Sequence, residues 1–187
     1  EMAFRESWIR GGEDEVSGIR LEFPGCLDRE RSFCHVPTDE KGLALWDIYL
    51  GFDPASGSKS RYSAYSAYVV LGKSRDKEDG NVYLVDYYKC QDNFDRILDW
   101  LLDGNPDYGI PGFYTLYRYK RATVEQNAFG RWLVDNDRVR SWIKSNLVVP
   151  HITGRNKADP VAGVIAMGEM FENGRFRIPY KEPSDQE

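Results

Sequence analysis

Apolar and polar residues alternate most regularly in the chain between Trp46 and Asp53. Ile48, Leu50 and Phe52 fall on one face of this segment, the period of two that is typical of a β-strand. Pro54 follows directly, and proline removes a backbone donor from a strand ladder. The pattern therefore predicts a strand over 46–53 that ends on a carboxylate.

Two further apolar runs, 64–71 and 82–88, are rich in tyrosine and valine. A charged segment that ends in Asp79-Gly80-Asn81 separates them, which predicts a hairpin with a long turn. Asp86 follows four apolar residues, so we expect it to be a solvated residue at a strand end.

Beyond residue 92 the apolar spacing alternates between the helical and the strand period. We expect Asp92 to cap the first helix of this part, and glycine or proline to end several of the elements. The predicted elements are a helix over 93–102, a strand over 121–125, a helical stretch over 129–143, a strand over 147–151, a helix from Asp159-Pro160 to Phe171, and a short strand over 175–179.

The resulting order is strand, strand, strand, helix, strand, helix, strand, helix. A hairpin followed by alternating helices and strands predicts an α/β fold, with a mixed sheet flanked by helices. The order is that of a ribonuclease H-like fold. We assign this domain to residues 46–187, and residues 1–45, which lack clear periodicity, to an N-terminal arm or linker segment.

The composition excludes few classes of protein. The chain has 187 residues, enough for one domain with a real core, and no apolar run reaches the roughly 20 residues of a membrane helix. Three cysteines are too few for a disulfide framework and indicate a reducing compartment. The net charge of −5 disfavours a nucleic-acid binder, although the position of the positive charges matters more than their sum.

Asp53 and Glu125 are the candidate catalytic residues. Each ends a short apolar strand, and ligands of open α/β sheets bind beyond the carboxyl ends of strands. Taken singly, each has a structural alternative: Asp53 as a turn residue before proline, and Glu125 as a carboxylate near a helix N-terminus. Together, on neighbouring parallel strands, they would repel each other unless a cation lay between them, and hard oxygen ligands favour Mg²⁺ or Mn²⁺.

Several segments of the chain resemble a known protein family. Gly51-Phe52-Asp53-Pro54-Ala55 resembles the Asp-Pro-Ala motif that ends a strand in the nuclease domain of bacteriophage large terminase subunits. The segment 123–129 is similar to the second acidic strand of that family. The segments 153–157 and 171–179 also resemble it, and Phe4-Arg5 to Trp8 resembles the exit from the family's ATPase domain.

The resemblance implies a metal-dependent endonuclease that cleaves double-stranded viral DNA concatemers during genome packaging. It implies that Asp53 and Glu125 bind two divalent ions, Mg²⁺ or Mn²⁺. It further implies an N-terminal ATPase domain, a small terminase subunit and a portal protein as partners, and the cytoplasm of the infected bacterial host as the location. We accordingly expect the chain to be a fragment.

The family's third acidic ligand follows its terminal short strand, so we expect it beyond Glu187. Asp159 is an alternative, but Asp followed by Pro is also the pattern of a helix cap and first helical residue.

Positive charge lies near both carboxylates in the sequence. We expect Lys59 and Arg61 after Asp53, and Arg155 and Lys157 after the last core strand, to contact DNA phosphates. A third group leads into the Glu125 strand and consists of Arg118, Lys120 and Arg121.

One apparent motif can be rejected, and two alternative functions remain. The segment Ala67-Tyr68-Val69-Val70-Leu71-Gly72-Lys73-Ser74 nearly matches a phosphate-binding loop, but its intervening residues are β-formers and a charged turn follows, so we expect no nucleotide site there. A ribonuclease H-like resolvase or integrase would share the nuclease chemistry. A catalytically silent DNA-binding module would use the carboxylates only for capping and turning.

Overall fold

The computed structural model describes residues 39–55, 64–126, 128–152 and 164–177. Most of the predicted N-terminal arm lies outside these residues. The described elements are β1 (Trp46–Asp53), β2 (Ser66–Ser74), β3 (Val82–Cys90), α2 (Phe94–Leu101), η1 (Pro106–Tyr108), α3 (Phe113–Tyr117), β4 (Arg121–Glu125), α4 (Ala128–Val134), α5 (Asp137–Lys144), β5 (Val148–His151), α6 (Val164–Glu172) and β6 (Phe176–Arg177).

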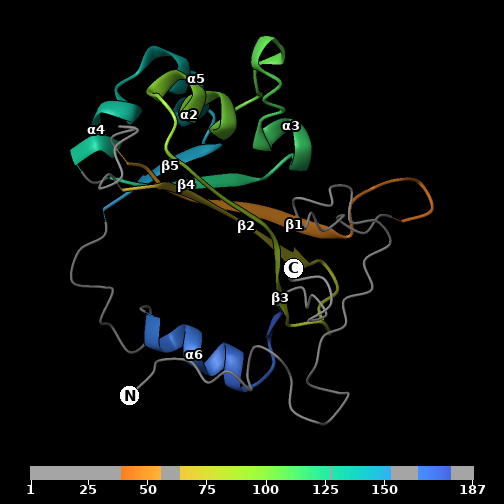
Figure 1. Ribbon diagram of the computed structural model, residues 1–187. Coiled ribbons are helices and arrows are strands. Elements are labelled where there is room, and N and C mark those ends of the chain that lie inside the picture. Colours follow the sequence, from red (N-terminus) through yellow and green to blue (C-terminus); the bar gives the residue numbers. More distant parts are fainter. Residues whose placement is uncertain (1–38, 56–63, 127, 153–163, 178–187) are drawn as a thin grey trace, which may run out of the picture. The chain divides into compact units, whose positions relative to one another are not determined.

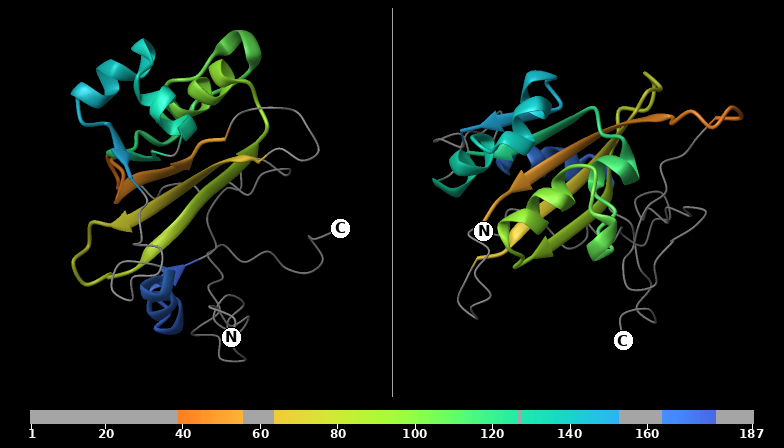
Figure 2. Two further views of the ribbon diagram at one scale, coloured as in Figure 1. Left: turned by 90° about the vertical axis from the view of Figure 1, so that its left-hand side faces the viewer. Right: turned by 90° about the horizontal axis from the view of Figure 1, so that it is seen from above.

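The strands form one sheet in the order β5-β4-β1-β2-β3-β6. β1 pairs in parallel with β4, β4 with β5, and β3 with β6. β2 and β3 run side by side and are joined by residues 75–81 (Figure 2). Because this connection is too short for a parallel crossover, the two strands form a hairpin. The mixed α/β sheet flanked by helices, predicted from the sequence, is confirmed.

The residues divide into two compact units. One contains Asp47–Leu71 and Tyr87–Thr153, and in it the helices α2 to α5 lie on one side of β1, β4 and β5 (Figure 1). Beneath these helices Phe52 stacks on Tyr68 with ring centroids 4.3 Å apart. The Tyr68 hydroxyl donates a 2.9 Å hydrogen bond to the carbonyl of Ile97, which ties β2 to α2.

The other unit contains the described parts of 1–46, 72–86 and 154–187. Here Trp46 stacks on Tyr83 at 4.2 Å, and Gly72 lies under the same indole. A Cβ at Gly72 would approach Trp46 Cε3 to 2.7 Å, so only glycine allows the ring to lie this close to the strand. In the same unit, Phe171 of α6 packs on Phe176 of β6 at 4.5 Å.

Several predictions about single elements need correction. Asn93, not Asp92, caps α2, because its side chain accepts a hydrogen bond from the Arg96 amide at 3.0 Å. The stretch 129–143 is two helices rather than one, since the Asn136 side chain accepts from the Arg138 amide and starts a new helix. Asp86 is buried in the interior of β3, because the strand continues to Cys90 instead of ending near residue 86.

No helix in the described part of the chain is both long and apolar enough to cross a membrane.

Candidate active site at the carboxyl ends of the parallel strands

Asp53 and Glu125 end two neighbouring parallel strands. The register pairs Phe52 of β1 with Val124 of β4, and the two carboxylates are the next residues of their strands. Adjacent strands lie about 4.8 Å apart. The prediction that the two residues stand at adjacent strand ends is therefore confirmed.

The two carboxylates also share a face of the sheet. Phe52 and Val124 are 3% and 0% exposed. Phe52 stacks on Tyr68, whose hydroxyl bonds to α2, and Val124 is its register partner, so both lie on the face that the helices of their unit cover. Successive side chains of a strand point to opposite faces, so Asp53 and Glu125 belong to the face away from those helices. Asp53 is exposed and Glu125 is half-buried, which is the burial expected of acidic groups that can reach solvent and an ion.

A glycine in α4 fixes the end of β4. Gly130 is buried, and a Cβ at this position would overlap the carbonyl oxygen of Glu125 and lie 3.3 Å from Pro54 Cγ. The helix therefore packs directly on the residues that end β1 and β4. Neither Gly130 nor its contact was selected by the sequence analysis, because a glycine inside a helical pattern has no distinctive sequence context.

His151 is a third polar residue at this edge, and the sequence analysis did not select it. It ends β5, it is exposed, and its register partner is Glu125. The amide of Gln126 donates a 2.7 Å hydrogen bond to the His151 carbonyl, which holds the two strand ends together. Its place at the end of the third parallel strand is the sequence feature that could have identified it.

The chemistry of the two carboxylates fits a divalent ion of the Mg²⁺ type. Such an ion is commonly held by one or two carboxylates, with waters and substrate phosphates completing its coordination. The described residues contain no group of three or more histidine, cysteine or acidic side chains placed to hold a metal. Asp159, the alternative third ligand, lies outside the described residues.

The predicted DNA contacts are only partly described. Lys59, Arg61, Arg155 and Lys157 all lie outside the described residues. Of the cations that precede β4, Lys120 forms a 2.6 Å ion pair with Asp47. Arg118 has a positive φ of 47° and lies over the Tyr114 ring at 5.2 Å.

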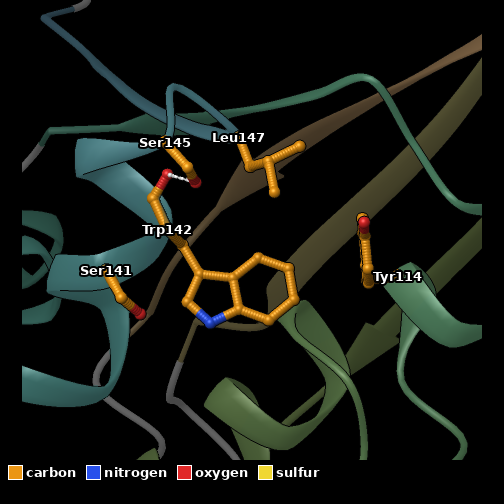
Figure 3. Close-up of a pocket in the computed structure, with 5 residues that line it drawn as sticks. All are labelled: Tyr114, Ser141, Trp142, Ser145 and Leu147. Carbon is orange, nitrogen blue, oxygen red and sulfur yellow. Dashed lines mark hydrogen bonds between the residues drawn. The ribbon is translucent and has the colours of Figure 1, made fainter.

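Two other features lie apart from the strand-end carboxylates. Gly72, Lys73 and Ser74 are part of β2, which continues three residues beyond the predicted end at Leu71, so the near match to a phosphate-binding loop is a strand. A hollow of about 230 Å³ is lined by Tyr114, Ser141, Trp142, Ser145 and Leu147 (Figure 3). Leu147 precedes the first residue of β5, whereas His151 is the last, so the hollow lies at the other end of that strand from the carboxylates.

Comparisons with known proteins give a distant structural likeness. No protein-family model matches the chain, and no curated protein matches its sequence. Among solved structures, the chain is similar to the large terminase nuclease of the thermophilic phage G20c (TM-score 0.40, 9% identity, 73% of this chain and 60% of that one). It is also similar to the P22 large terminase nuclease domain (TM-score 0.38, 10% identity, 72% and 61%).

The chain thus spans about 60% of the length of these two structures. Both belong to the family that the sequence motifs resemble, but identities and TM-scores this low carry no functional argument.

Proposed function

We propose that the protein is a metal-dependent endonuclease that hydrolyses phosphodiester bonds of double-stranded DNA, and that it acts on viral DNA concatemers during genome packaging. The observation that carries the nuclease proposal is the placement of Asp53 and Glu125 one residue beyond the Phe52–Val124 register pair. Two acidic groups on one face, at the ends of rigid parallel strands, form a preorganised position for cations and a phosphate.

In this proposal Asp53 and Glu125 hold two divalent ions, Mg²⁺ or Mn²⁺, and thereby orient the scissile phosphate. The ions would supply an activated water and charge stabilisation for the phosphoryl group. In the net reaction a water oxygen bonds to phosphorus, the bond from phosphorus to one sugar oxygen breaks, and that oxygen takes a proton. The protein positions the two carboxylates: the pairing of β1 with β4 sets the spacing between Asp53 and Glu125, and Gly130 allows α4 to pack against the end of β4.

The wider biological role is part of the same proposal. A packaging nuclease would work beside an ATPase domain, a small terminase subunit and a portal protein, in the cytoplasm of an infected bacterium. The sequence motifs quoted above support this role, and the strand-end carboxylates support its chemistry.

Cleavage of supercoiled plasmid DNA tests the proposal directly. The protein should nick or linearise the plasmid with Mn²⁺ or Mg²⁺, with little sequence preference, and EDTA should abolish the activity. Asp53→Asn and Glu125→Gln should each reduce cleavage to background while the far-ultraviolet circular dichroism is unchanged. Glu169→Gln, an exposed residue of α6, is the matched control and should cleave like wild type.

Two results would contradict the proposal. One is undiminished cleavage in EDTA, which would remove the metal dependence. The other is full activity in either strand-end variant. DNA binding without metal-dependent cleavage would instead identify a silent binding module.

A further inference from the structure

The face of the β1–β4 pair that carries Asp53 and Glu125 continues along both strands. The register aligns Tyr49 with Arg121 and Gly51 with Thr123, and the alternation of side chains places these four residues on the same face as the two carboxylates. We call Tyr49, Gly51, Arg121 and Thr123 the open β1–β4 face. It leads from the start of β4 to the strand-end carboxylates.

This face is accessible along its length. Tyr49 is 39% exposed, and Arg121 and Thr123 are exposed. Gly51 lies in the middle, where an added Cβ would have Val69 O, at 3.9 Å, as its nearest contact. Because Gly51 has no side chain, β1 carries no side chain on this face between Tyr49 and Asp53, and we call this position the passage.

Arg121 supplies positive charge at the start of the open β1–β4 face. Within the described residues Arg121 has no ion-pair partner, whereas the adjacent Lys120 is paired with Asp47. A guanidinium can bind a phosphate through two parallel hydrogen bonds. The hydroxyls of Thr123 and Tyr49 are also groups that commonly bind DNA phosphates.

The spacing suits a nucleic-acid backbone. Glu125 lies four positions after Arg121, which is about 13 Å along a strand at about 3.3 Å per residue. Duplex DNA presents one phosphate of each strand per 3.4 Å or so of axis, so the same length spans roughly four base pairs.

We infer that the open β1–β4 face binds the phosphate backbone of the DNA strand that enters the Asp53–Glu125 site, with Arg121 as a phosphate contact. This inference rests on the proposed nuclease function. It also specifies the path of the bound DNA strand, which runs along β4 from Arg121 towards Glu125.

Fluorescence anisotropy with a labelled DNA duplex, with Ca²⁺ replacing Mg²⁺, tests the inference. Arg121→Ala should weaken binding about 5- to 10-fold at low salt and lower the slope of log K against log salt by about one. Arg121→Lys keeps the positive charge, so its slope of log K against log salt should be close to that of wild type. Arg140→Ala is the matched control, since Arg140 is on α5 and is paired with Asp137; its affinity and slope should equal those of wild type.

Gly51→Val tests the passage independently of charge. Valine suits a strand better than glycine, and the nearest contact of the added Cβ would be Val69 O at an ordinary van der Waals distance of 3.9 Å, so the melting temperature should be unchanged or higher. DNA binding should nevertheless weaken, because the new side chain rises in the path of the backbone. A stable Gly51→Val protein with wild-type affinity, or an Arg121→Ala protein with wild-type affinity and slope, would overturn the inference.

Cleavage assays on the same variants separate this inference from the proposed function. If cleavage requires Asp53 and Glu125 but Arg121→Ala and Gly51→Val cleave dilute DNA as wild type does, the nuclease proposal survives and the inference fails. If binding depends on Arg121 and Gly51 but no metal-dependent cleavage occurs, the inference survives and the nuclease proposal fails.

Discussion

Gly130 of α4 lies directly against the backbone carbonyl of Glu125, the residue that ends β4. Gly130→Ala would place a methyl group on that carbonyl oxygen, so either the helix or the strand end must move. We expect a loss of about 1–3 kcal/mol in the free energy of unfolding, although alanine normally favours a helix over glycine. We also expect reduced cleavage, because the displaced atoms carry Glu125.

Chemical denaturation and the plasmid assay measure both effects. Gly80→Ala is the control, because nothing lies within 4 Å of the added Cβ, and its stability should change by less than about 0.5 kcal/mol. A Gly130→Ala protein with wild-type or higher stability would show that the contact is not restrictive.

The buried carboxylate of Asp99 gives a second prediction. Its side chain is 2% exposed, and it accepts hydrogen bonds from Arg138 at 2.5 Å and from Asn105 at 3.1 Å. Arg138→Ala removes the charged partner, and we expect a cost of about 1–3 kcal/mol in urea unfolding. Arg140→Ala should cost less than about 0.5 kcal/mol, because its partner Asp137 is 88% exposed.

A double variant distinguishes charge from packing at this position. If the buried negative charge causes the loss, Asp99→Asn should restore part of the stability of Arg138→Ala. No recovery in the double variant would assign the loss to the packing of the arginine side chain.

Alkaline pH should destabilise the protein through Tyr68. Burial raises the pKa of Tyr68 well above its usual value, and the hydroxyl donates to Ile97 O. The unfolded chain releases this proton near pH 10, whereas the folded protein retains it to higher pH. The contribution is therefore fully present below about pH 10 and is lost as pH rises towards the folded pKa.

Tyr68→Phe removes that ionisation. At neutral pH the variant should be about 1 kcal/mol less stable, because a buried hydrogen bond is lost. Between neutral pH and about pH 11 its stability should fall less steeply than that of wild type. Urea unfolding at a series of pH values measures this. If the stabilities of Tyr68→Phe and wild type fell equally steeply with pH, the loss at alkaline pH would not come from Tyr68.

Much of the fold could be predicted because its strands have clear boundaries. Pro54 ends β1 at Asp53, and the short β-branched run of β4 ends at Glu125, so both strands were located to the residue. The break between α4 and α5 was missed, because Asn136 interrupts an apolar pattern that otherwise continues at helical spacing.

The site itself could be predicted only in part. Strand ends can be located in a sequence, but the pairing that makes Asp53, Glu125 and His151 neighbours is a long-range property. The close approach of Gly130 to Glu125 likewise depends on how α4 packs, which local spacing does not encode.

Titration of Mn²⁺ into the protein by calorimetry tests the central claim, that Asp53 and Glu125 together bind divalent ions. The wild type should bind Mn²⁺, and Asp53→Asn and Glu125→Gln should each lose most of that binding, while Glu169→Gln binds as wild type does. Because both carboxylates act on the same cations, the double variant should lose little more than either single variant. Wild-type Mn²⁺ affinity in folded Asp53→Asn or folded Glu125→Gln would contradict the account.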